Sequence, residues 1–554
     1  MKRLFSFFLT TALLLSLAAC GDPAGQAQPT ESTPPATPMD STGKYPLDAS
    51  RNEAIINNLG TAADCDGNAR VYYQIFVGSF SDSNGDGIGD LRGIINRFDY
   101  LNDGDPNSGV SLGVEGIWLS PIFKSPSYHK YDVTDYYAID PQFGTMEDLQ
   151  ELIDLCKERD VQIILDLVIN HTAKNNTWFQ SFTDAHRNGN TNHEFYDFYS
   201  YSTTGEPGKT FYAINGTSEF YEGNFSGDMP ELNFDNINVR QAMVDVAKFY
   251  LDMGVSGFRF DAAKYIYYGE TEANTEFWKW YLDELRSIKP DIYTVAEVWD
   301  GDAITFPYFS STNCFNFTMS QTGGLISQTA QAGDVNAFTA YIDAYLEQIQ
   351  AENPNAMLCS FIANHDMDRA AGFLPVVNGR AKVGANLNIL TPGSPFIYYG
   401  EEIGLKGSRG GANTDANRRL AMNWGDGDTV KDPVGANYDN AGSNGSVLDQ
   451  LPNGDSLYNH YKKLIAIRKA NPEIAYGDYT ALKIENSKLG GFISTYNGSS
   501  VAVLHNTTND SITIDLAEIM EDPLTTLAAF VGVNDATIEG TVLTIGSQTS
   551  VVLR

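Results

Sequence analysis

The sequence has little cysteine and little positive charge. Its five cysteines are isolated from one another among 554 residues and lack the CxxC spacing of a zinc site, which argues against a metal centre built on Cys20, Cys65, Cys156, Cys314 or Cys359. Lysine and arginine number 36 against 70 aspartates and glutamates, and the formal net charge is -34. Basic residues do not cluster outside the N-terminus, so we exclude a nucleic-acid-binding protein.

The N-terminus carries a short apolar stretch after a basic start. Met1-Lys-Arg3 precedes Leu4 to Leu17, which is too short for a mature membrane span and is typical of a secretory signal. The stretch ends in Leu17-Ala-Ala-Cys20, which resembles a bacterial lipobox and implies cleavage before Cys20 and lipidation of that cysteine. An ordinary signal peptide with a chance cysteine is the alternative. We expect a secreted protein, lipid-anchored at the bacterial cell envelope or surface.

Apolar runs alternate with helical patterns through the middle of the chain. The run Val161 to Asn170 lacks strict alternation, as in a parallel strand that is buried on both faces. Thr145 to Arg159 has helical spacing, and Thr145 with Asp148 forms a capped start. Strand candidates lie near residues 71–77, 113–119, 161–169, 255–260, 291–296, 314–317, 357–363 and 395–399. Eight strands that alternate with helices predict a (β/α)8 TIM barrel with its active site at the carboxyl ends of the strands.

Three carboxylates follow such strands. Asp261 comes two residues after Arg259, so both side chains point to the same side of the strand and the guanidinium keeps the carboxylate ionised. Glu297 and Asp366 end two further strands. A retaining glycosidase needs a carboxylate nucleophile and a protonated carboxylic acid about 5 to 5.5 Å apart. Taken singly, these residues are more often a structural ion pair, a surface-loop acid and a helix N-cap; their ordered occurrence favours catalysis.

Six motifs carry a family resemblance from about Val71 to Trp424. They are Gly113-Val-Glu-Gly-Ile-Trp-Leu-Ser-Pro121, Asp166-Leu-Val-Ile-Asn-His171, Met229-Pro-Glu-Leu-Asn233, Gly257-Phe-Arg-Phe-Asp-Ala-Ala-Lys264, Glu297-Val-Trp299 and Phe361-Ile-Ala-Asn-His-Asp366. The chain resembles the α-amylase family, glycoside hydrolase family 13. The third motif resembles members intermediate between oligo-1,6-glucosidases and neopullulanases, and with the lipobox it suggests a bacterial lipoprotein α-amylase.

The resemblance implies a role for each motif residue. Asp261 is the nucleophile, Glu297 is the general acid and then base, and Asp366 holds sugar hydroxyls most tightly in the transition state. The residues expected to bind substrate include Arg259 and extend to Tyr131, which stacks on the sugar, His171 and His365, which hydrogen-bond it, Asp132 and Arg419, which pair beside it, and Lys264, which reaches the leaving group. Tyr265 departs from the histidine of many α-amylases, which puts the leaving-group contacts in doubt.

The loop after the first strand spaces oxygen ligands at alternate residues. Asp82, Asn84, Asp86, the Ile88 carbonyl and Asp90 resemble a structural calcium loop of the family. Gly93 stands where an EF-hand carries its bidentate glutamate, so the loop is not an EF-hand. An Asn/Asp/Gly turn without metal is the alternative. We expect Ca2+ as a structural cofactor, and a second calcium at Asn170 is a weaker possibility.

The chain divides into five parts. We expect a lipoprotein signal peptide over 1–19, a flexible linker over 20–66, a catalytic barrel over 67–171 and 234–470, an inserted B domain over 172–233 after the third strand, and a C-terminal antiparallel β-sandwich over 471–554.

The predicted function is retaining endo-hydrolysis of α-1,4-glucosidic bonds in starch, glycogen and maltooligosaccharides by a monomer. Ala262 after the nucleophile resembles α-1,4-acting enzymes. The alternatives are an exo-acting α-glucosidase or oligo-1,6-glucosidase, since Asp132 with Arg419 would close the cleft into a pocket, and a neopullulanase. Transglycosylation would use the same covalent intermediate. Alternatives of another class are a starch-binding surface lipoprotein without catalysis and a solute-binding lipoprotein of a transporter, against which the three carboxylates and the eightfold pattern argue.

Overall fold

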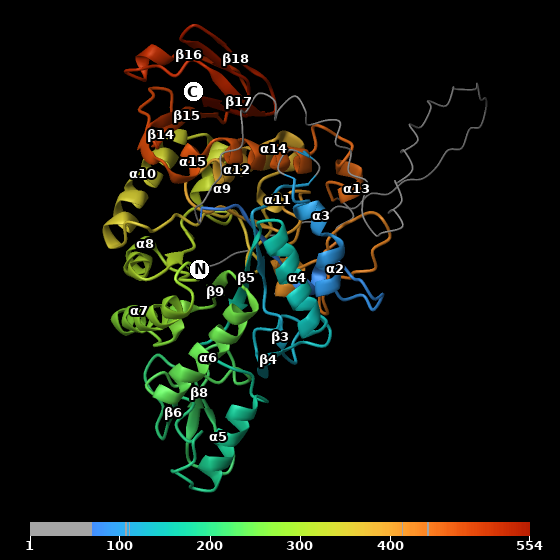
Figure 1. Cartoon of the computed structure of the whole chain (residues 1–554), viewed down its shortest axis with the longest axis vertical. Coiled ribbons are helices and arrows are strands. Elements are labelled where there is room, and N and C mark those ends of the chain that lie inside the picture. Colours follow the sequence, from blue (N-terminus) through green and yellow to red (C-terminus); the bar gives the residue numbers. More distant parts are fainter. Residues whose placement is uncertain (1–68, 106–107, 110, 413, 440–442) are drawn as a thin grey trace, which may run out of the picture. The chain divides into compact units, whose positions relative to one another are not determined.

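The computed structural model describes residues 69–105, 108–109, 111–412, 414–439 and 443–554 (Figure 1). The predicted signal peptide, Cys20, Cys65 and the linker up to residue 66 lie outside the described residues. The described cysteines Cys156, Cys314 and Cys359 are buried free thiols. In these residues no helix has the length and apolar character that crossing a bilayer requires.

A parallel sheet of seven strands forms the centre of the fold. Along the sheet the order is β11-β10-β9-β5-β2-β1-β12, and each neighbouring pair is parallel. The strands are β1 (Tyr72–Ile75), β2 (Gly116–Leu119), β5 (Gln162–Leu167), β9 (Gly257–Phe260), β10 (Tyr293–Ala296), β11 (Asn313–Cys314) and β12 (Phe396–Tyr398). Their residues are almost all buried, as expected for strands with both faces covered.

The segment at 357–363 closes this sheet into a barrel. It forms isolated parallel bridges rather than a regular strand, with Cys359 opposite Phe315 and Phe361 opposite Phe396. The amide of Phe396 donates to the carbonyl of Ser360 at 2.7 Å. The segment therefore lies between β11 and β12 as the seventh strand, and the predicted (β/α)8 barrel is confirmed.

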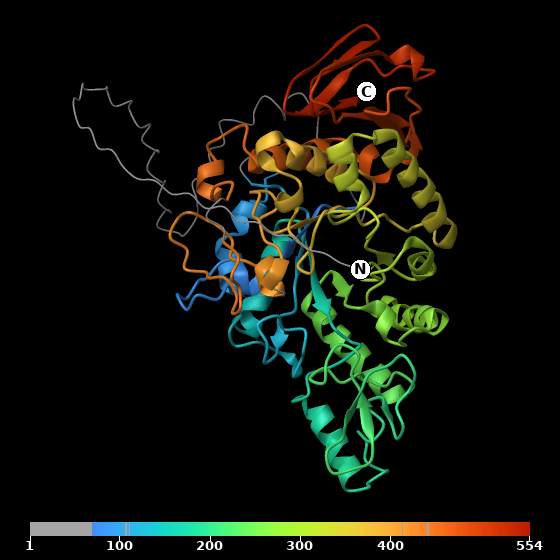
Figure 2. The same ribbon diagram turned by 180° about the vertical axis from the view of Figure 1, so that it is seen from behind.

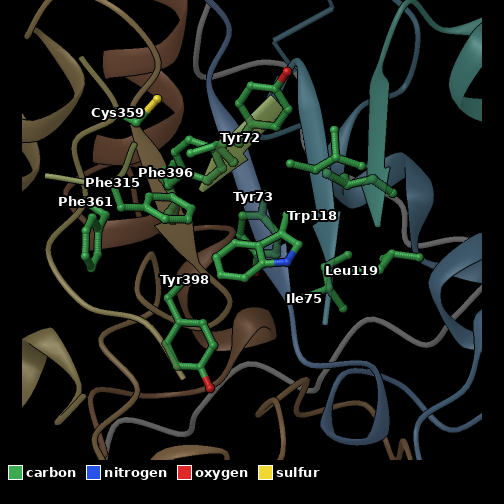
Figure 3. Packing of buried hydrophobic residues seen from close by; sticks show 14 of the residues in the cluster. Tyr72, Tyr73, Ile75, Trp118, Leu119, Phe315, Cys359, Phe361, Phe396 and Tyr398 are labelled. Atoms are coloured by element: carbon green, nitrogen blue, oxygen red, sulfur yellow. The ribbon is translucent and has the colours of Figure 1, made fainter. Parts of the chain in front are cut away.

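Aromatic side chains fill the barrel interior. The rings of Tyr72 and Phe396 stack with centroids 4.8 Å apart, and Trp118 lies beside Phe315 at 5.4 Å (Figure 3). Gly257 permits the closest approach of two strands, since a Cβ at this position would lie 1.7 Å from the carbonyl oxygen of Tyr293. This contact explains the glycine that opens the motif of the predicted nucleophile.

Helices lie outside the strands in both ribbon views (Figure 1, Figure 2). The predicted helix is α4 (Met146–Glu158), and Thr145 and Asp148 form its capping box. The other helices of the described barrel are α2 (Leu91–Asn96), α3 (Phe98–Leu101), α6 (Ile237–Met253), α7 (Thr271–Ile288), α8 (Asp302–Thr305), α9 (Leu325–Ala332), α10 (Val335–Glu352), α11 (Ala370–Phe373), α12 (Arg380–Ile389), α13 (Val447–Gln450) and α14 (Leu457–Ala470).

Two further regions are built from antiparallel strands. Between β5 and α6 lie α5 (Thr177–Arg187) and a sheet of β6 (Tyr201–Ser202), β8 (Phe220–Glu222) and β7 (Phe211–Ala213), while β3 (Phe123–Lys124) and β4 (Asp135–Ile139) pair after β2. After α15 (Pro472–Tyr476), two antiparallel sheets enclose a second core; their strands are β13 (Asp478–Ala481), β14 (Leu489–Tyr496), β15 (Ser499–Asn506), β16 (Ile512–Asp515), β17 (Leu527–Gly532), β18 (Ala536–Glu539), β19 (Val542–Ile545) and β20 (Thr549–Leu553). The predicted C-terminal sandwich is thus present.

Candidate active site

One guanidinium group holds the carboxylates at the ends of three neighbouring strands. The Nη1 atom of Arg259 lies 2.7 Å from Oδ1 of Asp261 and 2.7 Å from Oδ1 of Asp166, while its Nη2 atom donates to Glu297. Arg259 is fully buried, and in the strand register it lies opposite Asp166. The prediction that Arg259 and Asp261 face the same side is confirmed.

Burial changes the pKa values of the residues in this cluster. It raises the pKa of Glu297 to about 8 and that of Asp166 to about 7, although the positive charge of Arg259 opposes both shifts. Burial also disfavours the charged form of Arg259, but the surrounding carboxylates outweigh this effect and raise its pKa. Glu297 therefore retains a proton at neutral pH beside a permanent cation, as the predicted general acid requires.

Asp366 follows the seventh strand, and its pKa is shifted in the direction opposite to that of Glu297. Its Oδ1 atom accepts from Nη2 of Arg419 at 2.7 Å, and its Oδ2 atom lies 3.0 Å from Nε2 of His365. Burial raises the pKa of Asp366, but its interactions with His365 and Arg419 outweigh burial and lower the pKa below the usual range. Asp366 is thus an anion beside the protonated Glu297.

His365 and Tyr131 lie next to Asp366 and meet through the tyrosine hydroxyl. Their rings are 5.4 Å apart and nearly parallel, and the Tyr131 hydroxyl lies 2.5 Å from Nε2 of His365. The Nδ1 atom of His365 lies 2.7 Å from Nε2 of the Gln74 side chain. Burial lowers the pKa of His365. Because the two rings meet at the tyrosine hydroxyl, His365 leaves the faces of the Tyr131 ring uncovered.

His171 is buried at the base of the insertion. Its Nδ1 atom lies 2.8 Å from Nδ2 of the Asn170 side chain, and burial lowers the pKa of His171. Its Nε2 atom has no hydrogen-bond partner within the described residues, and neither has Oδ1 of Asn170. A buried nitrogen without a partner costs free energy unless a ligand supplies one, which fits the predicted contact with a sugar hydroxyl.

Asp132 and Arg419 do not form the expected pair. Asp132 accepts hydrogen bonds from Ser125, at 2.6 Å, and from Ser127. Arg419 instead bonds Asp366, the carbonyl of His365 and, at 3.1 Å, the hydroxyl of Tyr128. Both serines donate to Oδ1 of Asp132, whereas the donors of Arg419 are engaged by Asp366, the His365 carbonyl and Tyr128.

Lys264 lies beside the loop of Glu297, the predicted general acid. Its Nζ atom donates to the carbonyl of Trp299 at 2.8 Å and to Asp300 at 2.9 Å. Ala262, directly after Asp261, has φ 44° and ψ 46°, a left-handed conformation that is unusual for a residue other than glycine. This turn lets the amide of Ala263 donate to the carbonyl of Glu297 at 2.9 Å. It links the backbones that carry Asp261 and Glu297.

A cavity of about 460 Å3 lies beside Asp366, between Trp299 and Arg418. A larger cavity of about 1110 Å3 is lined by Ile292, Asn313 and Pro392. These three residues lie at or before the amino ends of their strands. Because barrel enzymes act at the carboxyl ends, the smaller cavity belongs to the candidate site.

Comparison with known proteins identifies the family. Residues 74–477 match the model of the alpha amylase catalytic domain. The chain belongs to the α-amylase family. It is 34% identical over 446 residues to Alpha-amylase 3 of Dictyoglomus thermophilum, covering 79% of this chain and 84% of that protein. It is 30% identical over 470 residues to a 4-alpha-glucanotransferase of Thermotoga neapolitana, covering 80% and 97%.

A solved structure agrees with the sequence relatives. The structure titled Eubacterium rectale Amy13B matches with a TM-score of 0.81 and 31% identity, covering 90% of this chain and 97% of that one. The family resemblance read from the motifs is confirmed, and the protein is an enzyme of the glycoside hydrolase class.

The predicted calcium loop of this α-amylase family member is held by its own hydrogen bonds. Asp82 accepts from the amides of Asn84, Gly85 and Gly87, and Asp86 accepts from the amide of Ile88 at 2.8 Å. Asp90 caps α2 through the amide of Gly93. Nowhere in the described ranges do three or more acidic, histidine or cysteine side chains converge as a metal site. The calcium site in this loop stays a prediction.

Asp166, Gln74 and Trp118 belong to the α-amylase site but were not among the predicted site residues. Asp166 bonds Arg259 and also accepts from Tyr131 at 2.9 Å and from Trp118 at 3.3 Å. The sequence did carry evidence for Asp166 as a site residue, because Asp166 opens one of the six motifs at the end of a strand. Gln74 lies inside an apolar strand, where only the three-dimensional neighbour His365 gives it a role.

Proposed function

We propose that this enzyme cleaves internal α-1,4-glucosidic bonds of starch, glycogen and maltooligosaccharides and retains the anomeric configuration. The observation that carries the proposal is the guanidinium of Arg259, which contacts both Asp261 and Glu297 while burial keeps a proton on Glu297. In retaining enzymes the nucleophile and the acid lie about 5 to 5.5 Å apart. Two carboxyl groups that bind the same guanidinium are suited to this close spacing.

The first step forms a glycosyl-enzyme. Glu297 gives its proton to the glycosidic oxygen as Asp261 attacks the anomeric carbon, so that the bond to the leaving chain breaks and an ester bond to Asp261 forms. Glu297, now ionised, then takes a proton from water, whose oxygen displaces Asp261. The positive charge of Arg259 stabilises the negative charge on Asp261 and on Glu297 in both steps.

Asp366, His365 and His171 supply the contacts with the sugar at the cleavage point. Asp366 is anionic because Arg419 pairs with it, so it accepts from sugar hydroxyls whose acidity rises in an oxocarbenium-like transition state. The unpartnered Nε2 of His171 donates to or accepts from another hydroxyl, according to its tautomer. Tyr131 completes the site with its aromatic surface.

Endo-action draws support from the partner of Arg419. The exo-acting alternative relied on an Asp132–Arg419 pair that would close the cleft, and Arg419 is engaged with Asp366 instead.

Action on α-1,4 bonds draws support from Ala262 and from the name of the relative in Dictyoglomus thermophilum, Alpha-amylase 3. We further propose that the enzyme is a monomer anchored by lipid at Cys20 and that calcium binds the loop at 82–90.

The test is reducing-end release from a maltoheptaoside blocked at its nonreducing end. The protein without its first residues should cleave it, and Asp261→Asn should abolish cleavage while Asp510→Asn, an exposed change on the C-terminal domain, leaves it intact. Absence of cleavage by the unsubstituted protein contradicts endo-action. Release of glucose from unblocked maltoheptaose or cleavage of isomaltose would then identify the exo or α-1,6 alternative.

A further inference from the structure

A cavity that the proposed reaction does not use lies at the amino ends of the barrel strands. Its volume of about 1110 Å3 is slightly above the range of about 300–1,000 Å3 that is usual for ligand pockets. Residues before β11 and β12 form one wall, and α10, α15 and β14 form the others. Asp261, Glu297 and Asp366 follow the opposite ends of the barrel strands, so a ligand in this cavity does not reach them.

The cavity continues along α10 as a groove. A neighbouring hollow of about 680 Å3 shares Asp343 and Glu347 with the cavity and extends to the segment 481–485. Helix α10 packs against β13 and β14 (Figure 1). Its residues that line the two hollows run from Asn336 to Glu352, which is about 24 Å at about 1.5 Å per residue. We call the two hollows together the base groove, and its length suits an extended chain better than a compact molecule.

Two tyrosine rings lie in the base groove. Tyr476 is the last residue of α15 and Tyr496 is the last residue of β14, and their ring centroids are 5.6 Å apart with the planes inclined at 34°. Tyr496 is 36% exposed, and within the described residues its hydroxyl has no hydrogen-bond partner. An exposed ring with a free hydroxyl suits a pyranose, which presents C–H groups on its faces and hydroxyls on its rim.

Polar side chains surround the two rings. Gln350 on α10 and Asn355 beyond its end are exposed, and their side chains make no hydrogen bond with the part of the chain that the structure describes. The charged residues that line the cavity are mostly acidic: Asp343, Glu347, Glu352 and Asp478 against Arg286. Such a lining repels phosphate and other anions, whereas free amides and carboxylates accept hydrogen bonds from the hydroxyls of a neutral sugar.

We propose that the base groove is a second binding site for an α-glucan chain, separate from the site of cleavage. The inference rests on the proposed function, because a polymer that is the substrate of the active site also supplies chains to the groove. A chain bound there keeps the enzyme on the polymer and raises the concentration of cleavable bonds near the active site. It is not the chain being cleaved, so turnover of a short oligosaccharide does not depend on the groove.

The experiment measures retardation of the full chain by soluble starch in a native gel, in a detergent without a sugar head group. Asp261→Asn is present in every protein, so that the starch is not degraded. We expect Tyr496→Ala to raise the Kd for starch about three- to tenfold and Tyr496→Phe, which keeps the ring, to change it little. Tyr137→Ala is the matched control, because Tyr137 is 45% exposed on β4 and does not line the groove.

A second measurement separates the groove from the active site. With Asp261 restored, Tyr496→Ala and the unsubstituted enzyme should have the same kcat/KM on maltotetraose. Gln350→Ala tests the groove from α10 if Tyr496→Ala fails to fold, because Gln350 is exposed and lies outside the sheet. Loss of its neutral hydrogen bond should raise the Kd for starch about two- to tenfold.

Two results overturn the inference. Equal Kd values for starch in Tyr496→Ala, Gln350→Ala and Tyr137→Ala mean that the base groove binds no glucan. A fall of kcat/KM on maltotetraose by the same factor as the loss of starch binding means that Tyr496 supports the active site and not a separate one. Failure of the unsubstituted enzyme to cleave maltotetraose or starch, with retardation that still depends on Tyr496, contradicts the proposed function and leaves the binding site in place.

Discussion

The hydroxyl of Tyr131 donates to Asp166, with 2.9 Å between the two oxygens, and the same carboxylate accepts from Arg259 at 2.7 Å. Asp166 is 1% exposed, so it connects Tyr131 to Arg259, the cation that also binds Asp261, without contact with solvent. Asp166→Asn offers only one oxygen to these two donors and turns its NH2 group toward one of them. We expect kcat to fall about 10- to 100-fold, since a lost hydrogen bond to a charged group costs about 1.5–3 kcal/mol.

A double-mutant cycle tests whether Asp166 and Tyr131 act together or whether each substitution lowers activity independently. Tyr131→Phe removes the hydroxyl that would clash with the new NH2 group, so Asp166→Asn together with Tyr131→Phe should lose less activity than the product of the two single losses. The measurement is kcat and KM on maltoheptaose for the four proteins. If the losses simply multiply, the two residues act independently and the proposed connection is wrong.

The raised pKa of Glu297 predicts the alkaline limit of activity. Burial raises this pKa to about 8, and a general acid works only while it is protonated, so kcat/KM should fall as pH rises through about 8. A pH profile of hydrolysis of a maltooligosaccharide measures the limb. A maltosyl fluoride is the control substrate, because its leaving group departs without a proton and its first step should persist above that pH. An identical alkaline limb for both substrates would assign the titration to another group.

The barrel and the position of the three carboxylates at its rim could be predicted, because local patterns determine them. Buried parallel strands are apolar runs, and polar residues at their ends meet at one rim of any barrel, so Asp261, Glu297 and Asp366 follow from position in the chain. The capping box of Thr145 and Asp148 is equally local.

The pairings between distant segments could not be predicted. Arg419 was expected to pair with Asp132, but it bonds Asp366, while Ser125 and Ser127 donate to Asp132. The seventh strand was predicted as a regular run, yet it pairs through only two bridges, because each of its neighbours, β11 and β12, is a short strand. Such contacts join residues far apart in sequence, where a pattern carries no signal.

Removal of calcium tests the loop at 82–90. If the loop binds the ion, excess EGTA should lower Tm, since saturation at 100 times the dissociation constant adds about 2.7 kcal/mol to the free energy of unfolding. Asp82→Asn should abolish the response, because Asp82 organises the loop through three backbone amides. Asp510→Asn is the control. Equal Tm values in calcium and in EGTA would favour a metal-free turn.

Substitution of Cys20 tests the anchor. Cys20→Ser leaves the apolar stretch intact but removes the thiol that a lipid would modify. We expect the full-length protein to partition into detergent and to pellet with membranes, and the variant to appear in the soluble secreted fraction. Equal membrane association of the two proteins would contradict lipidation at this residue.

Glu401 makes stability depend on pH. Its Oε1 atom accepts from the Tyr461 hydroxyl at 2.8 Å, its Oε2 atom has no partner in the described structure, and burial raises its pKa to about 8. Below a pH of about 4.5 both the folded and the unfolded chains hold the proton, so the stabilisation is fully present; it is lost as pH rises through about 8.

In Glu401→Gln this titration is absent. The free energy of unfolding of the unsubstituted protein, measured by urea titration relative to the variant, should therefore fall by up to about 4 kcal/mol between pH 5 and pH 9, because each pKa unit corresponds to about 1.4 kcal/mol. Glu539→Gln makes the same chemical change at an exposed position of β18 and should show no such slope. A difference between the protein and Glu401→Gln that stays constant with pH would mean that Glu401 is ionised, and accommodated, across the whole range.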